Sequence, residues 1–313
     1  MKYYSGPNDE SWNGRSDPGY WYQQISKLPL RQISAHTGGA YALLGYACEE
    51  GVIRNQGRPG AAAGPSAFRQ QLGSTAWHLG DTEVFDAGDL VCREGDLEGC
   101  QTEYAAGIET LLTHNYFPVG IGGGHDIAFG TYSGVRNFLG TDSRLGIINF
   151  DAHFDLRAPN ESSNSGTPFY QAYQQQKSLG HPMDYLVLGI QQAANTATLF
   201  KTAQESGTQF IFNDQLWEGL EPTAITDFLE PLDAVYLTID MDVFASAYAP
   251  GVSAASPMGI SPAKVMTYLL PILKSGKVVA IDLAELSPAH DTQAQTAKLA
   301  ARLLNWILQT IKS

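Results

Sequence analysis

Short apolar runs rich in Val, Ile, Leu and Tyr alternate along this chain with longer segments that are compatible with helices. Several of the runs are apolar without alternation, which is typical of strands that are covered on both faces. The pattern predicts strands at residues 40–46, 83–85, 118–121, 145–150, 185–190, 209–212, 234–239 and 278–283.

The segments between these strands include a predicted helix at residues 64–72 and a long amphipathic helix at the C-terminus. Apolar residues in this last segment recur at helical spacing, as in Ala300, Leu303, Leu304, Ile307 and Ile311. The alternation of strands and helices predicts an α/β fold with a largely parallel sheet between helical layers. In such folds, functional side chains gather at the carboxyl ends of the strands.

The chain has 313 residues and is 43% hydrophobic, which is ample for a sizeable core. We expect one catalytic domain over residues 1–313. Residues 1–36 form an N-terminal extension packed on it, with Tyr20, Trp21 and Tyr22 as the docking residues.

The amino-acid composition limits which partners and which cellular compartment are expected. Lys and Arg total 19 against 32 Asp and Glu, a net charge of −13, so nucleic acid and anionic membranes are poor partners. Only three cysteines occur, Cys48, Cys92 and Cys100, which favours free thiols over a disulfide scaffold. The N-terminus lacks the pattern of a signal peptide, and no apolar stretch approaches the ~20 residues that span a bilayer. We expect a soluble, cytoplasmic protein.

Polar residues interrupt the apolar pattern at three strand ends. A histidine follows a glycine turn after the strand at 118–121, and residues two apart follow the strands at 145–150 and 234–239, so each set projects from one face. The six residues are His125, Asp151, His153, Asp155, Asp240 and Asp242. One such motif alone is usually a cap or a turn. The glycine run also differs from a dinucleotide-binding loop, because His125 stands where its last glycine belongs, and it lacks the end of a Walker A loop.

These residues predict a pair of divalent metal ions. Aspartates placed after buried strands need compensation, and the four negative charges match two divalent cations. Oxygen ligands outnumber nitrogen ligands and no thiolate is present, which favours manganese, with other divalent metals left open. Six ligands suit two ions about 3.5–4 Å apart.

The segments GGGHD (122–126), DAHFD (151–155) and DMD (240–242) resemble, in order and spacing, the metal-binding motifs of the ureohydrolase family of arginases and agmatinases. The resemblance implies a three-layer α/β/α fold, hydrolysis of a C–N bond, a homo-oligomer, and the six residues named above as ligands of two Mn²⁺ ions per subunit.

Within this family, segments 51–58, 163–169, 249–253 and 285–291 are similar to those of members that cleave N-formimino-L-glutamate to L-glutamate and formamide in histidine degradation. Arginases carry a histidine where this chain has Ser165. One alternative is a guanidine hydrolase acting on arginine, agmatine or a guanidino acid. Another, from a different class, is a metal-binding protein without catalysis.

The small anionic substrate that this resemblance implies gives further residues a role. We expect Arg157 to bind a substrate carboxylate, because its planar guanidinium suits bidentate binding. The resemblance implies that Glu285 faces the formimino group, and we expect Asp155 to relay a proton to the departing nitrogen. Asn195 is a further substrate-binding candidate, and weaker candidates for the glutamyl end are Arg54, Asn55 and Arg58.

Overall fold

The computed structural model describes residues 1–219 and 223–312. The strands are β1 (Tyr4–Ser5), β2 (Ser26–Lys27), β3 (Ala40–Ala47), β4 (Val84–Val91), β5 (Tyr116–Gly122), β6 (Leu145–Phe150), β7 (Asp184–Ile190), β8 (Gln209–Phe212), β9 (Ala234–Asp240) and β10 (Val278–Ala284). Within the described residues they form one sheet of ten strands in the order β1-β4-β3-β5-β10-β9-β6-β7-β8, with β2 paired to β4 off this path. The pairing of β1 with β4 is antiparallel, and the other pairings are parallel.

Every strand predicted from the apolar pattern is present, but β4 is longer than the predicted 83–85. Its later half contains Asp86 and Asp89, which conceal the strand from a hydrophobicity pattern. The fully buried Arg69 compensates both carboxylates, with Nη2 2.9 Å from Asp86 Oδ1 and Nη1 2.6 Å from Asp89 Oδ1. The two-residue strands β1 and β2 are too short to give a pattern.

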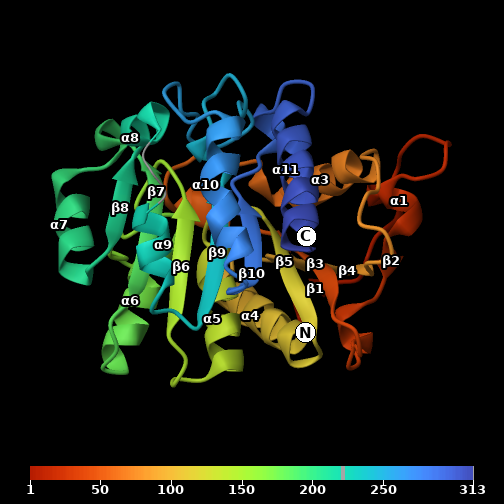
Figure 1. Ribbon diagram of the computed structural model, residues 1–313, viewed down its shortest axis with the longest axis horizontal. Coiled ribbons are helices and arrows are strands. Elements are labelled where there is room, and N and C mark those ends of the chain that lie inside the picture. Colours follow the sequence, from red (N-terminus) through yellow and green to blue (C-terminus); the bar gives the residue numbers. More distant parts are fainter. Residues whose placement is uncertain (220–222, 313) are drawn as a thin grey trace.

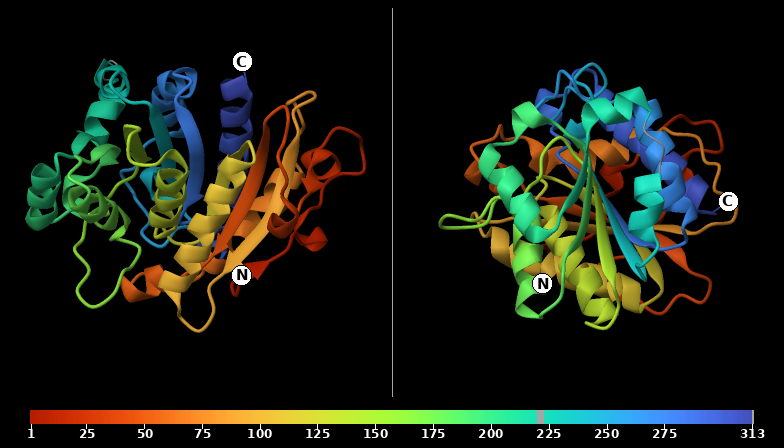
Figure 2. Two further views of the ribbon diagram at one scale, coloured as in Figure 1. Left: turned by 90° about the horizontal axis from the view of Figure 1, so that it is seen from below. Right: turned by 60° about the vertical axis from the view of Figure 1, so that its left-hand side comes forward.

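Helices cover both faces of the sheet (Figures 1 and 2). They are α1 (Trp21–Gln24), α2 (Glu50–Arg54), α3 (Gly64–Gly73), α4 (Leu97–Thr113), α5 (Ile127–Leu139), α6 (Pro168–Ser178), α7 (Ala197–Ser206), α8 (Asn213–Glu218), α9 (Thr223–Leu229), α10 (Pro262–Lys274) and α11 (Gln295–Lys312). Side chains of α3, α9, α10 and α11 share one core with one face of the sheet. Those of α4, α5, α6 and α7 share a second core with the other face. The predicted three-layer arrangement is confirmed.

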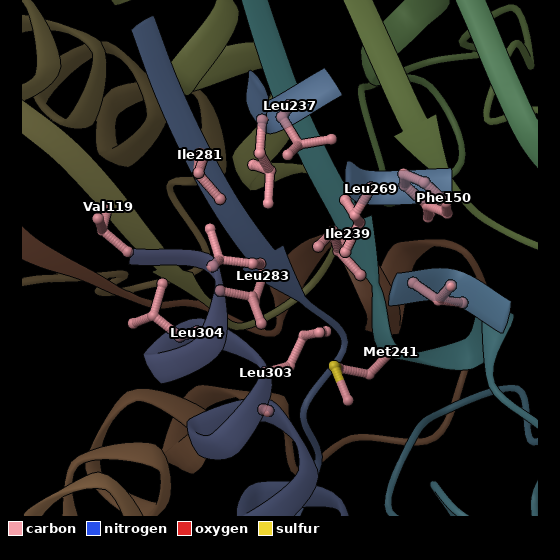
Figure 3. Packing of buried hydrophobic residues seen from close by; sticks show 14 of the residues in the cluster. Val119, Phe150, Leu237, Ile239, Met241, Leu269, Ile281, Leu283, Leu303 and Leu304 are labelled. Atoms are coloured by element: carbon pink, nitrogen blue, oxygen red, sulfur yellow. The ribbon is translucent and has the colours of Figure 1, made fainter. Parts of the chain in front are cut away.

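The C-terminal helix α11 buries the apolar stripe that its sequence predicts. Figure 3 shows Leu303 and Leu304 of α11 directed toward Leu283 of β10, with Leu269 of α10 over the neighbouring strand. Leu304 is fully buried and Leu303 nearly so. Burial of each such leucine contributes about 1.5–3 kcal/mol relative to leaving it exposed. This packing holds the last helix against the centre of the sheet.

The N-terminal segment packs against the rest of the chain. Trp21 is fully buried, and its indole Nε1 donates to Asn305 Oδ1 of α11 at 2.9 Å. The Trp21 ring also meets Trp77 edge-on, with centroids 4.8 Å apart. The first and the last helix are therefore in direct contact.

Strand β10 lies in the middle of the sheet although it comes last in the sequence. It pairs with β5 on one side and with β9 on the other. The parallel strands β5, β10, β9 and β6 therefore end side by side, and the residues that follow them meet at one edge of the sheet. None of the helices in the described residues has the length and the apolar character that crossing a membrane requires. The three cysteines are free thiols.

Candidate metal centre

The residues that follow β5, β6 and β9 bring a first cluster of ligand atoms together. The Nδ1 atom of His125 lies 2.9 Å from Asp155 Oδ2, 3.1 Å from Asp151 Oδ2 and 3.1 Å from Asp240 Oδ2. Adjacent ligands of an octahedral ion with bonds of about 2.1 Å are separated by about 3.0 Å, which is the spacing seen here. This cluster can hold one metal ion.

A second cluster lies beside the first. Here His153 Nδ1 is 3.0 Å from Asp242 Oδ2 and 3.4 Å from Asp151 Oδ1. Asp151 contributes Oδ2 to the first cluster and Oδ1 to the second. One carboxylate is therefore placed to bridge two neighbouring ions.

The backbone holds these carboxylates in place. His153 N–H donates to Asp151 Oδ1, and Asp242 N–H donates to Asp240 Oδ1, each at 2.7 Å. Asp155 has a positive φ of 48°, which is uncommon outside glycine and costs about 1–3 kcal/mol. Such strain is concentrated at functional sites, where the surrounding structure enforces one side-chain direction.

The electrostatics of the cluster match its candidate role. Burial would lower the pKa of His125 and of His153, but their carboxylate neighbours carry both pKa values well above the usual range. Burial also raises the pKa of Asp240, with further contributions from Asp242 and Asp151. Without metal, protonated histidines therefore compensate the aspartates. Metal ions have to displace these protons, which couples metal binding to pH.

A cavity of about 320 Å³ opens over the cluster. Its wall includes both histidines, Asp155, Asp240 and Asp242, together with Asn55, Gln56, Gly57, Arg58, Arg157, Ser165, Ser253, Ala254 and Glu285. A larger cavity of about 720 Å³ lies at the amino ends of β3, β5 and β10. None of the six clustered residues lines that cavity, so we place the chemistry in the smaller one.

Glu285, directly after β10, is fixed on the cavity wall. Its Oε1 accepts a hydrogen bond of 2.9 Å from the backbone N–H of His125, and its own N–H donates to Gly123 O at 2.8 Å. The residue has a positive φ of 64°. Burial raises the pKa of Glu285 to about 8. A cationic group arriving beside this carboxylate would favour its ionised form.

Arg157 lies on the same wall with its guanidinium uncommitted. Its side chain is exposed, and it makes no ion pair or side-chain hydrogen bond with other described residues. The backbone N–H of Arg157 donates to Gly166 O at 2.9 Å, which connects this residue to the segment that contains Ser165. A Cβ at Gly166 would lie only 3.0 Å from Arg157 Cδ, so glycine gives this arginine its room.

The other two arginines near the cavity are held more firmly. The guanidinium of Arg54 bonds to Glu50, Glu98 and two backbone carbonyls, and the side chain does not line the cavity over the cluster. The guanidinium of Arg58 does line it. Its Nε donates to Ser253 O at 2.9 Å and its Nη2 to Val252 O at 2.6 Å, which leaves Nη1 for other partners.

Asn195 is placed differently from what we expected. It does not line the cavity, and its amide is occupied by backbone groups. Oδ1 accepts from Phe154 N–H at 3.0 Å, while Nδ2 donates to the carbonyls of Ala152 and Gln191, both at 2.9 Å. This arrangement favours support of the 151–155 loop over contact with a substrate.

Behind the ligands lies a set of buried polar residues that was not predicted from the sequence. The Nε2 atom of His125 lies 3.0 Å from Thr238 Oγ1, and Tyr46 OH donates to Asp126 Oδ2 at 2.7 Å. Asp282, in the middle of β10, is fully buried. The signal for Asp282 was a carboxylate inside an otherwise apolar run, because burying such a group is costly.

Comparison with known proteins identifies the class. Residues 40–309 match the sequence model of the arginase family, and the chain belongs to this family. Among its relatives, the formimidoylglutamase of Aeromonas salmonicida is 41% identical, covering 94% of this chain and 95% of the relative. The formimidoylglutamase of Geobacillus thermodenitrificans is 42% identical, covering 95% and 94%.

Solved structures share the fold. The formimidoylglutamase of Bacillus subtilis superposes with a TM-score of 0.80 at 23% identity, covering 91% of this chain and 92% of the other. The Trypanosoma cruzi formiminoglutamase with Mn²⁺₂ gives a TM-score of 0.80 at 22% identity, covering 91% and 99%. The family resemblance noted in the sequence is thus confirmed.

Proposed function

We propose that this chain hydrolyses N-formimino-L-glutamate to L-glutamate and formamide, with two Mn²⁺ ions held by the six clustered residues. The observation that carries the proposal is the cavity over the cluster, whose wall presents one carboxylate, Glu285, and two guanidinium groups, Arg58 and Arg157. The substrate has the complementary charges, a cationic formimino group and two carboxylates. The names of the full-length relatives support the same assignment.

The donor set fits the metal that we propose. Four carboxylates and two imidazoles suit Mn²⁺, and their charge balances two divalent ions. Bound divalent ions would supply the Lewis acidity that makes water nucleophilic near neutral pH and stabilises developing negative charge.

The side chains on the wall position the substrate. Oε1 of Glu285 is occupied by the His125 N–H, so Oε2 is left to accept N–H bonds from the formimino group. Arg157 binds one carboxylate with its planar fork. Nη1 of Arg58 is available for the second, on a guanidinium already fixed by two backbone carbonyls. Together these contacts hold the formimino carbon over the cluster.

Asp155 serves as the proton carrier in this proposal. Its Oδ2 faces His125, and the residue lines the cavity, so the other oxygen can exchange a proton with the substrate side. Water adds to the formimino carbon, and Asp155 takes a proton and passes it to the glutamate nitrogen. The bond between that nitrogen and the carbon then breaks, which releases glutamate, while formamide keeps the other nitrogen.

A product assay on Mn²⁺-loaded protein tests the assignment. N-formimino-L-glutamate, L-arginine, agmatine and a guanidino acid are supplied in parallel, with glutamate detected by glutamate dehydrogenase and urea by a colour reaction. We expect glutamate and formamide from the first substrate and little urea from the others. Faster release of urea would overturn the substrate and leave the metal-dependent hydrolase in place. No turnover of any substrate would favour a non-catalytic metal protein.

The expected cytoplasmic location and homo-oligomeric state stay predictions. Size-exclusion chromatography with light scattering measures the second directly.

A further inference from the structure

A buried carboxylate lies behind the metal centre, on the side away from the substrate cavity. Asp282 of β10 is fully buried and does not line the cavity over the cluster. Its Oδ2 accepts hydrogen bonds from Thr131 at 2.6 Å and from Tyr236 at 2.5 Å. Oδ1 has no hydrogen-bond partner among the described residues, and no Lys or Arg of that part of the chain pairs with the carboxylate. A buried acid with so little compensation requires an explanation.

The explanation that we offer begins at the imidazole ring of His125. Its Nδ1 faces the three carboxylates of the first cluster, so Nε2 carries a hydrogen whether or not a metal is bound. That N–H donates to Thr238 Oγ1, 3.0 Å away. Because the Thr238 oxygen accepts this bond, the hydroxyl hydrogen of Thr238 must find an acceptor of its own.

The acceptor within reach is Asp282. Thr238 stands directly opposite Asp282 in the ladder between β9 and β10. Burial raises the pKa of Asp282, and hydrogen bonds from Thr131, Thr238 and Tyr236 oppose that rise. The Tyr236 phenol, two residues before Thr238 on the same strand, also donates to Asp282. Because paired residues of neighbouring parallel strands project to the same face of the sheet, the Thr238 hydroxyl that meets His125 lies beside this carboxylate.

We propose that Asp282 acts through Thr238 as a positioning residue for His125. The buried negative charge orients the Thr238 hydroxyl, which fixes the His125 ring and makes Nδ1 a stronger metal ligand. Outer partners of this kind orient the histidines of many metal sites, and their loss commonly weakens metal affinity. Neither this role nor these two residues belongs to the substrate-binding wall described above.

The two ions should differ in their dependence on Asp282. His125 belongs to the first cluster only, and the second cluster of Asp151, His153 and Asp242 does not include it. Asp282 should therefore control the affinity of one ion and leave the other nearly unchanged.

A double-mutant cycle tests this on full-length protein. The variants are Asp282→Asn, Thr238→Val, the two combined, and Thr131→Val as a matched control. The control removes one hydrogen bond from Oδ2 of the same carboxylate without touching Thr238. Isothermal titration with Mn²⁺ gives the two dissociation constants, and thermal melting with and without Mn²⁺ gives the stabilisation that the metal provides.

We expect Asp282→Asn and Thr238→Val each to lower the affinity for one of the two ions by about 10–100-fold and the affinity for the other by less than about threefold. The combined variant should match Thr238→Val alone, because the effect of Asp282 passes through Thr238. Metal-free Asp282→Asn should melt at the same temperature as the parent or higher, since a buried charge is gone. Thr131→Val should lower the melting temperature and leave both dissociation constants nearly unchanged.

Equal weakening of both ions together with a lower melting temperature of metal-free Asp282→Asn would overturn the proposal, because Asp282 would then only support the fold. Additive losses in the combined variant would also overturn it. Should Asp282→Asn fail to fold, Thr238→Ser decides: it keeps the hydroxyl and should retain the affinity that Thr238→Val loses. Equal affinities of these two variants would refute the role of the hydroxyl.

Discussion

Replacing Arg157 by glutamine removes the one uncommitted guanidinium on the cavity wall. A charge-assisted hydrogen bond to a carboxylate contributes about 1.5–3 kcal/mol, or roughly 10–150-fold in kcat/KM. Because the Arg157 side chain is exposed and no described residue holds it in place, solvent screening favours the lower part of that range. We therefore expect a loss of roughly 10–30-fold with N-formimino-L-glutamate.

The assay compares initial rates on this substrate with rates on a formamidine that has no carboxylate. Only the first substrate should lose rate, and the Mn²⁺ content should not change, since Arg157 contributes no atom to either cluster. Arg144→Gln is the matched control, because Arg144 precedes β6 at the opposite edge of the sheet and pairs with Asp184. An equal loss with both substrates, or no loss at all, would refute the assignment of Arg157 to a carboxylate.

The remaining predictions concern the metal centre. Asp151→Ala should remove both Mn²⁺ ions and Asp242→Ala only one, as elemental analysis will show, because Asp151 alone has an oxygen in each cluster. Metal-free protein should melt at lower temperatures as the pH rises from about 5 to 8, because the folded state raises the pKa of Glu285 from 4.5 to about 8 and so holds that proton more tightly. Glu285→Gln should flatten this dependence in melting scans, and an unchanged slope would contradict it. Asn195→Ala should lower metal affinity and stability but not raise KM at saturating Mn²⁺, whereas a raised KM would restore the substrate contact that we first expected.

The apolar pattern located the strands because both faces of this sheet are covered. It located them least well where polar groups are satisfied by distant partners. Asp86 and Asp89 are accommodated in a strand because Arg69, from α3, pairs with both, and the Trp12 indole also donates to Asp86. Asp282 fits β10 for a similar reason, since its hydrogen-bond donors come from α5 and β9. Such compensation depends on tertiary contacts that no local pattern contains.

Candidate ligands could be found from sequence because alternate residues of an extended chain project to one side. Which ligand belongs to which cluster could not be predicted in this way. Spacing does not reveal that Asp151 shares its two oxygens between clusters, which requires the separate approach of His125 and His153 from different loops. Likewise, nothing near Asn195 in the sequence indicates that its amide is saturated by the backbone of the 151–155 loop.

The central place of β10 has a consequence for synthesis. Residues up to Gly122 build one half of the sheet and residues from Leu145 to Asp240 build the other, and among the described strands only β10 pairs with both halves. His125 follows the last strand of the first half, whereas its partner ligands Asp151, Asp155 and Asp240 stand at the ends of β6 and β9 in the second half. On the ribosome, the halves can each begin to pair, but the full ligand set has no fixed geometry until residue 284 and the helix behind it have emerged. Capture of the ion at the first cluster is therefore expected to be one of the last events of folding, whereas Asp151, His153 and Asp242 of the second cluster all follow strands of the second half.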